Sequence, residues 1–172
     1  MKAGLVLAAL AAATLAGCQT MSDEDPPRAT AGLASTKGNK TVGEVTFEQI
    51  GSKVRVTAQV INLKPNGEHG FHIHEAGDCS SGDGMSAKGH FNPFGKPHGS
   101  GGERHAGDLP NLKADAKGRA KLVAEVDVIT VTPGPASIVG RGVIIHADPD
   151  DYKTQPTGNA GARLACGVIK AG

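Results

Sequence analysis

The stretch KVRVTAQVINLKPNGEHGFHIH, residues 53–74, contains a strand pattern, a turn and a pair of histidines. Apolar and polar side chains alternate over residues 54–60, which predicts a half-buried β-strand. Pro-Asn-Gly at 65–67 is a turn signal, and the strand that follows ends in His72 and His74. Because these histidines are two residues apart, both rings project from the same face of the strand and can reach one ion. Taken alone, such a pair is also compatible with two exposed polar residues.

The same alternation recurs on both sides of this stretch. Two long segments, residues 76–112 and 147–162, are rich in glycine and polar residues and show little periodicity. Short strands separated by long loops predict an all-β protein with an antiparallel β-sandwich or barrel. The other strands are expected at residues 29–35 and 42–49, which form a hairpin, and at 121–128, 141–146 and 163–169.

Composition and charge restrict the possible functions. The 172 residues predict one domain, and 25 glycines, 10 prolines and 3% aromatic residues favour many turns around an aliphatic core. The formal net charge is +1, without a basic stripe that could neutralise phosphates. This excludes nucleic acid as an expected partner.

The N-terminal segment has the pattern of an export signal. Residues 4–16 are apolar and uncharged, but the run is too short to span a bilayer comfortably. It ends in Leu-Ala-Gly-Cys at 15–18, which resembles a bacterial lipoprotein box. We therefore expect a signal peptide at 1–17, a lipidated tether at 18–28 with the lipid on Cys18, and the folded domain at 29–172. The alternative is an ordinary signal peptide followed by a chance cysteine.

The export signal bears on the membrane and on the other two cysteines. The residue after Cys18 is Gln19, not the aspartate associated with inner-membrane retention, which favours the outer membrane. Lipidation of Cys18 leaves Cys79 and Cys166 as an even pair, and an oxidising compartment favours a disulfide between them. Two buried free thiols are the alternative.

Seven side chains have the composition of a metal site. Seven ligands are too many for one four-coordinate ion and one too few for two, so that a shared histidine completes two sites. Imidazole suits copper and zinc, and a carboxylate among histidines suits zinc. A polar loop with scattered histidines is the alternative, and His146 could also be a hydrogen-bonded core residue. We interpret the seventh histidine, His69, as a packing or hydrogen-bonding residue. The candidate ligands are His72, His74, His90, His98, His105, Asp108 and His146.

Five ordered motifs carry a resemblance to a known family. They are Gly70-Phe-His-Ile-His-Glu75, Gly89-His-Phe-Asn-Pro93, Arg104-His-Ala-Gly-Asp108, Val143-Ile-Ile-His146 and Gly161-Ala-Arg-Leu-Ala-Cys-Gly-Val168. Together they resemble Cu/Zn superoxide dismutase in its bacterial envelope form, over about residues 29–170. The resemblance implies an immunoglobulin-like Greek-key fold and dismutation of superoxide by a redox-cycling copper beside a structural zinc. Copper is required because zinc has no redox chemistry.

The resemblance also implies a role for each candidate residue. It assigns copper to His72, His74, His90 and His146, and zinc to His90, His98, His105 and Asp108, with His90 as the bridge. It further implies a disulfide between Cys79 and Cys166, an orienting carboxylate at Asp150, which binds one histidine of each metal, and an anion anchor at Arg163.

The expected partner is superoxide, in a periplasmic enzyme that contacts the membrane only through its lipid and is a monomer or homodimer. Lys88, Lys96 and Lys153 are candidates for steering the substrate. Two other classes of protein stay open at this point. One is a metal-delivery lipoprotein on the same fold, which would be expected to lack copper ligands or the arginine that this chain keeps. The other is a structural envelope lipoprotein, which leaves the seven ligands unexplained.

Overall fold

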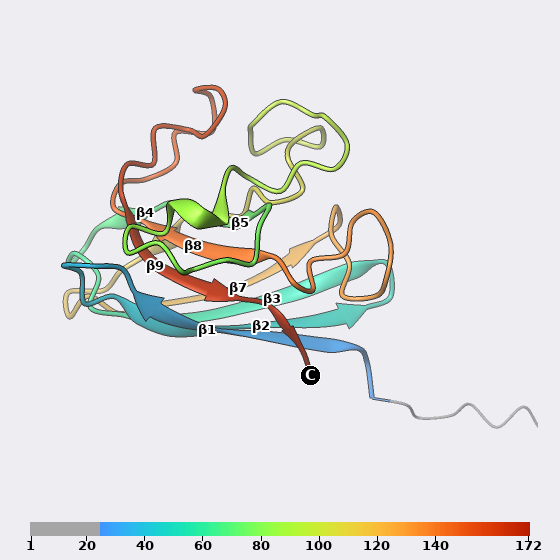
Figure 1. The fold of residues 1–172 in the computed structure, drawn as a ribbon, viewed down its shortest axis with the longest axis horizontal. Coiled ribbons are helices and arrows are strands. Elements are labelled where there is room, and N and C mark those ends of the chain that lie inside the picture. Colours follow the sequence, from blue (N-terminus) through green and yellow to red (C-terminus); the bar gives the residue numbers. More distant parts are fainter. Residues whose placement is uncertain (1–24) are drawn as a thin grey trace, which may run out of the picture.

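Strand β1 (Arg28–Ser35) connects the two layers of the fold in the computed structural model, which describes residues 25–172. Residues 28–33 of β1 pair with β2 (Val42–Ile50), and its last two residues pair with β9 (Arg163–Val168). One layer continues from β2 through β3 (Lys53–Ile61) to β7 (Ala120–Val126). The other continues from β9 through β8 (Gly142–His146) to β5 (Phe71–His74), and the two layers face each other in Figure 1.

All strand pairs of this curled sheet are antiparallel, in the order β5-β8-β9-β1-β2-β3-β7. Strand β10 (Lys170–Ala171) also pairs with β1, and β4 (Glu68–His69) pairs with β6 (Leu112–Lys113) apart from the main sheet. The predicted all-β sandwich is confirmed. The chain crosses from β3 by way of β4 to β5, and from β7 to β8, and each of these two connections links strands near opposite ends of the sheet.

The alternation read from the sequence fixes which side chains form the core. Val45 and Phe47 of β2 are fully buried, whereas Glu48, the next residue along the strand, is only partly buried. Residues 54, 56, 58 and 60 of β3 are likewise buried. Burying a side chain such as valine or phenylalanine stabilises the fold by about 1.5–3 kcal/mol. A one-residue slip of register would expose these side chains and is therefore unfavourable. The predicted strand at 121–128 is shorter than expected, because β7 ends at Val126 and residues 127–128 form a bend.

Strands β5 and β8 differ from the others, because they are buried on both faces. Phe71 and Ile73 point into the core between the layers, which places His72 and His74 on the outer face of the same strand. Residues 75–111 and 147–162 cover that outer face. Apart from the 3₁₀ turn η1 (Met85–Ala87), these segments contain no helix or named strand. Loops therefore bury what would otherwise be solvent-facing histidines.

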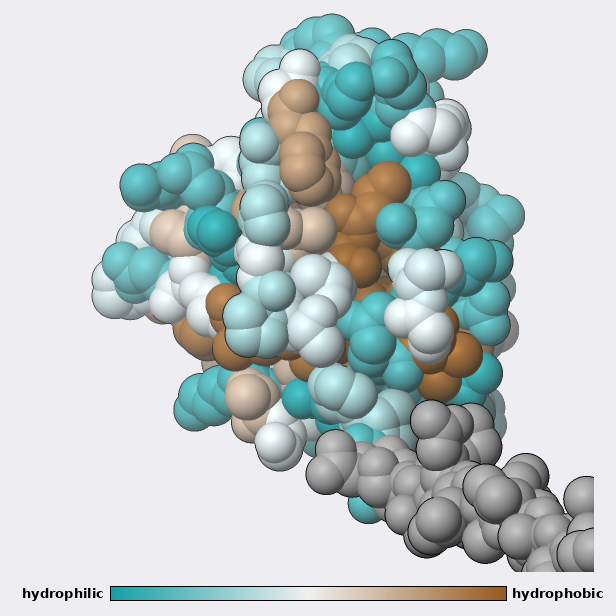
Figure 2. All heavy atoms as spheres, turned by 90° about the vertical axis from the view of Figure 1, so that its right-hand side faces the viewer, coloured by the Kyte–Doolittle hydropathy of each residue, from teal (hydrophilic) through white to brown (hydrophobic). Residues whose placement is uncertain are grey.

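One end of the sandwich is shown in Figure 2, where apolar residues at the centre of the face are surrounded by hydrophilic ones. Within residues 25–172, no helix is both long and apolar enough to cross a membrane. The expected signal peptide at 1–17, Cys18 and most of the tether at 18–28 lie outside the described residues.

Candidate metal centre

Residues 75–111 are held against β5 by backbone hydrogen bonds around Gly107. The N–H of Ile73 donates to the Gly107 carbonyl at 2.9 Å, and the N–H of Gly107 donates to Phe91 at 2.9 Å. A Cβ at Gly107 would overlap the Ile73 carbonyl oxygen, so that only glycine allows this approach. The contact places His90 and Asp108, the neighbours of Phe91 and Gly107, beside the outer face of β5.

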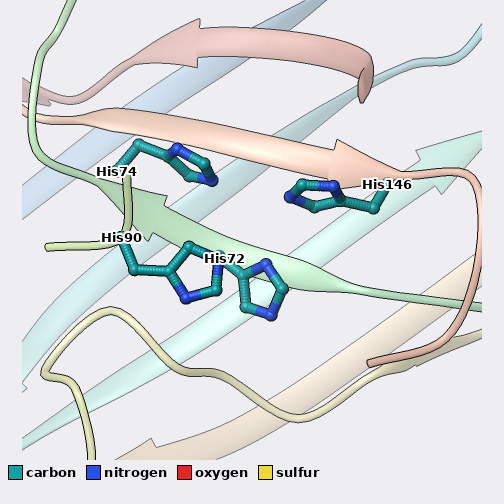
Figure 3. A group of neighbouring side chains, drawn as sticks. All are labelled: His72, His74, His90 and His146. Carbon is teal, nitrogen blue, oxygen red and sulfur yellow. The ribbon is translucent and has the colours of Figure 1, made fainter. Parts of the chain in front are cut away.

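Two groups of buried side chains result, and they share one residue. Within each group the potential ligand atoms all lie within 4.8 Å of one another. Figure 3 shows the first group, in which four imidazole rings from β5, β8 and the loop surround a common space. The groups are His72, His74, His90 and His146, and His90, His98, His105 and Asp108.

The nitrogen atoms of these rings fit bound metal ions. Each histidine of the first group uses one nitrogen in a hydrogen bond, as His74 Nδ1 does with the Lys88 carbonyl at 2.8 Å and His90 Nδ1 does with the Asp108 carboxylate at 2.8 Å. Within residues 25–172, each of the six histidines of the two groups has one ring nitrogen that is buried without a hydrogen-bond partner, as does His69 outside them. A buried polar atom left without a partner is costly. Coordination to a metal removes that cost, and the nitrogen bonded to protein fixes the tautomer.

Electrostatics keep these ligands in the protonation state that a metal requires. Burial, reinforced by the neighbouring histidines, holds the pKa of His72 and His74 well below the usual value. Burial also lowers the pKa of His146 to about 4. For Asp108, burial raises the pKa, but hydrogen bonds with His90 and the Gly99 N–H outweigh this effect and the net shift is downward. At neutral pH the three rings are neutral and the carboxyl group is ionised, as metal binding demands.

Asp150 connects the two groups. Its Oδ2 lies 2.9 Å from His72 Nε2, and its Oδ1 lies 2.8 Å from His98 Nε2. Asn111 exchanges two hydrogen bonds with the Asp150 backbone, at 2.9 and 3.0 Å. A Cβ at Gly158, where φ is +66°, would overlap the Asp150 carboxylate, so that glycine is required here as well. The carboxylate is thus fixed between one ring of each group.

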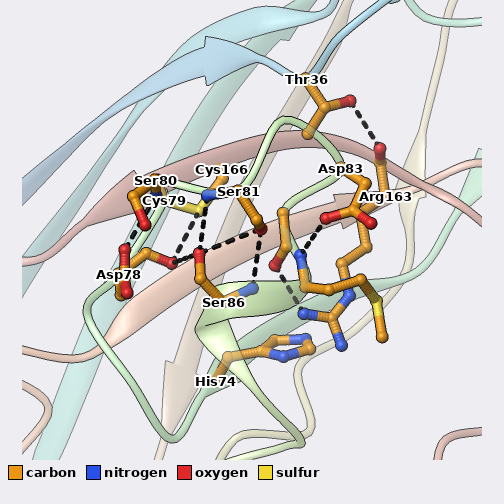
Figure 4. Close-up of a disulfide and its surroundings, with 12 residues drawn as sticks. Thr36, His74, Asp78, Cys79, Ser80, Ser81, Asp83, Ser86, Arg163 and Cys166 are labelled. Atoms are coloured by element: carbon orange, nitrogen blue, oxygen red, sulfur yellow. Dashed lines mark hydrogen bonds between the residues drawn. A yellow bond between two sulfur atoms is a disulfide. The ribbon is translucent and has the colours of Figure 1, made fainter.

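A cleft of about 460 Å³ opens onto the first group, with His74, His90, His146 and Arg163 among its lining residues. Figure 4 shows the Arg163 guanidinium extending toward His74. It donates to the Gly84 carbonyl at 2.7 Å and to the Lys88 carbonyl at 2.6 Å. Arg163 is therefore a fixed positive charge at the edge of the histidine group, suited to a small anion.

A disulfide between Cys79 and Cys166 anchors the segment that holds this arginine. The predicted pairing is confirmed. Cys166 lies on β9, three residues after Arg163, and Cys79 precedes the turn whose carbonyl groups the guanidinium contacts. The covalent bond thus ties the arginine's strand to the loop that orients its side chain.

The comparisons with known proteins agree with this geometry. Residues 41–169 match the family model described as copper/zinc superoxide dismutase (SODC). The chain belongs to this family. It is 43% identical over 146 residues to superoxide dismutase [Cu-Zn] 1 of Aquifex aeolicus, a match that covers 81% of this chain and 86% of the relative. It is 45% identical over 148 residues to superoxide dismutase [Cu-Zn] of Candida glabrata, covering 80% and 95%.

Solved structures show the same fold. The clock protein EA4 is 42% identical, covers 86% of this chain and 96% of its own, and superposes with a TM-score of 0.76. A SOD-like protein from Bacillus subtilis is 35% identical, with coverage of 80% and 95% and a TM-score of 0.74. Dismutation of superoxide is the reaction of the copper/zinc superoxide dismutase family, and the two side-chain groups can hold its copper and zinc.

The structure shows where the expected ligands, His69 and the candidate steering lysines lie. All seven expected ligands lie in the two groups, and His69 is buried outside them, with its Nδ1 2.8 Å from the His146 carbonyl oxygen. The lysine that lines the cleft is Lys37, from the turn after β1, which sequence reasoning missed. Of the expected steering lysines, Lys96 is paired with Glu103 at 2.6 Å. No sequence pattern predicts that Lys37 lines the cleft, because its position depends on the contact between its turn and the loop around Gly82.

Proposed function

We propose that this chain dismutates superoxide, 2 O₂⁻ + 2 H⁺ → O₂ + H₂O₂, with one copper and one zinc per chain. Copper is assigned to the group that opens onto the cleft, and zinc to the group that contains a carboxylate, because a set of three histidines and one aspartate is a closed tetrahedral zinc site. The ligands are His72, His74, His90 and His146 for copper and His90, His98, His105 and Asp108 for zinc.

Copper would supply one-electron redox chemistry and zinc a fixed positive charge. The protein contributes the remaining steps. Arg163 binds the anion through its guanidinium and holds it near the His74 side of the cleft. His90 belongs to both groups: its Nδ1 lies 2.8 Å from Asp108 Oδ1, and its buried Nε2, which has no hydrogen-bond partner within residues 25–172, is available to hold a proton. Asp150 fixes the orientation of His72 and His98 through their Nε2 atoms.

The observation that carries this proposal is the complete ligand set, with Arg163 on the same cleft. A metal-delivery protein on this fold is the other candidate, and the solved relative that is described as only SOD-like is a reason to consider it. A delivery protein has no need of an anion anchor beside a buried, doubly used histidine. The enzyme accounts for both features.

Separate removal of each metal tests the assignment. We expect His146→Ala to lose copper and all dismutase activity but to retain zinc, and Asp108→Ala to lose zinc but still bind copper. Metal content per chain and dismutation rate are measured on the same samples. If both variants lost the same metal, or if the fully loaded protein were inactive, the proposal would be wrong.

We further propose that the protein is exported and anchored by a lipid on Cys18, with a signal peptide at 1–17, a tether at 18–28 and the enzyme domain at 29–172. The Leu-Ala-Gly-Cys sequence and the disulfide support an oxidising compartment outside the cytoplasm. Labelling of cells with a radioactive fatty acid tests the anchor. We expect label on the wild-type chain and none on Cys18→Ser, and an unlabelled wild-type chain would contradict the proposal. Sedimentation of the delipidated protein distinguishes monomer from homodimer.

A further inference from the structure

The amide of Gln155 binds both backbone groups of one residue across the site. Its Oε1 accepts from the N–H of His98 at 2.8 Å, and its Nε2 donates to the carbonyl of His98 at 2.9 Å. Gln155 lies on the exposed surface of residues 147–162, whereas His98 belongs to residues 75–111. Within the described residues, the N–H and carbonyl of His98 have no backbone hydrogen-bond partner. The Gln155 amide pairs with both groups, as the backbone of a neighbouring strand would.

The ring of His98 is held as firmly as its backbone. The side chain is fully buried, with Nε2 bonded to Asp150 at 2.8 Å and Nδ1 3.0 Å from Asp108 Oδ2. Asp150 and Gln155 are both on residues 147–162, so this segment contacts His98 through the ring and through the backbone. Rotation or withdrawal of His98 therefore requires that the segment move with it.

The same segment forms a wall of the cleft. Thr157, Gly161 and Ala162 line the cleft on the C-terminal side of Gln155. Close internal bonds, such as that from the Gly158 N–H to the Thr154 carbonyl at 2.7 Å, make residues 154–158 a tight turn. A clamp at Gln155 therefore positions the cleft wall as well as His98.

We propose that Gln155 is a positioning residue that locks residues 147–162 onto the zinc group, so that zinc retention and the order of the cleft wall depend on it. The inference rests on the assignment of zinc to the group that contains His98. Outer partners of metal ligands typically affect metal affinity about 10- to 100-fold. Through Asp150, loss of the clamp also reaches His72 in the other group.

Two substitutions and a control separate this role from others. Gln155→Ala removes both hydrogen bonds to His98, together with a longer one from Nε2 to the Lys153 carbonyl at 3.3 Å, which Lys153→Ala leaves in place because it involves only the backbone of Lys153. Gln155→Glu keeps an acceptor for the His98 N–H but places a second carboxylate oxygen against the His98 carbonyl, so that it does not restore the clamp. Lys153→Ala changes a residue of the same segment that is also exposed, and no side-chain hydrogen bond or ion pair of Lys153 is found within residues 25–172.

The experiment measures zinc transfer from the full chain, loaded with copper and zinc, to a chromogenic chelator at pH 7. We expect zinc affinity to fall about 10-fold or more in Gln155→Ala and Gln155→Glu, and to stay within about twofold of wild type in Lys153→Ala. The copper EPR spectrum of the two Gln155 variants should shift toward that of zinc-free wild-type protein as zinc leaves.

A merely structural role gives a different result. Urea unfolding of the metal-free variants reports global stability, which a positioning residue on the surface should leave close to that of Lys153→Ala. The inference is overturned if Gln155→Ala binds zinc as tightly as wild type does. It is also overturned if the free energy of unfolding of the metal-free Gln155→Ala variant falls by as much as its free energy of zinc binding. Failure of the zinc assignment itself is visible without any variant, as a wild-type chain that binds no zinc.

Discussion

Replacement of Lys88 by glycine should make the protein more stable. Lys88 has φ +63° and ψ −146°, a region of backbone conformation that is essentially restricted to glycine. Its carbonyl oxygen accepts hydrogen bonds from His74 Nδ1 at 2.8 Å and from Arg163 at 2.6 Å. The site therefore holds a side-chain-bearing residue in a strained conformation in order to orient a metal ligand and the anion anchor.

The sign of the effect follows from two opposing free energies. Residues in such conformations cost about 1–3 kcal/mol in the folded state, and glycine increases the entropy of the unfolded chain by an amount equivalent to about 0.4–1 kcal/mol. The ion pair of Lys88 with Glu75 spans 3.6 Å with both side chains more than half exposed, so that its loss matters little. Lys88→Gly should therefore raise the free energy of unfolding by about 0.5–2 kcal/mol.

Urea unfolding of the metal-free, oxidised protein measures this change. Lys88→Ala is the matched control, because it removes the same charge and ion pair but keeps the Cβ that causes the strain. We expect Lys88→Ala to lie within about 0.5 kcal/mol of wild type and Lys88→Gly to be more stable than both. A glycine variant less stable than the alanine variant would refute the reasoning.

Three other predictions follow from the disulfide, the buried histidines and the cleft. Replacing Cys79 and Cys166 by serine opens a loop with a sequence separation of 87 and should lower the free energy of unfolding by about 4–5 kcal/mol; a loss below about 1 kcal/mol would contradict this. Because the folded pKa of His146 is about 4 and the unfolded value is about 6.5, the unfolded chain binds the proton between these values. Urea midpoints should therefore show metal-free protein losing about 2 kcal/mol from this residue between pH 7 and 5, and unchanged stability would contradict the shift. Lys37→Gln should lower kcat/KM roughly twofold to threefold at low ionic strength and flatten its salt dependence, whereas Lys96→Gln, which removes a charge already paired with Glu103, should have little effect in the same stopped-flow assay.

The strands could be predicted from the sequence because their signal is local. Alternation from Val54 to Val60 directly reports which side chains a two-layered sandwich buries, and the structure buries them. The likeness of the segments around His72, His90 and His146 to a known family was also sufficient to group the ligands. β7 ends two residues earlier than its alternation suggests, because the chain bends at Asp127.

The contacts between loops could not be predicted in this way. Gln155 and His98 are 57 residues apart, and no periodicity relates two segments that lack regular structure. Lys37 reaches the cleft because its turn packs against Gly82, and the conformation of Lys88 is invisible in its residue type. These features depend on how two long loops fold over the outer face of β5 and β8, which only the three-dimensional arrangement shows.

The most direct test is the rate of superoxide dismutation by the chain loaded with copper and zinc, measured against ionic strength beside Arg163→Ala. We expect rapid, copper-dependent dismutation that slows as salt is added, and a large loss of kcat/KM in the variant with both metals still bound. A chain that holds one copper and one zinc but dismutates superoxide no faster than its Arg163→Ala variant would contradict the enzyme and favour metal delivery.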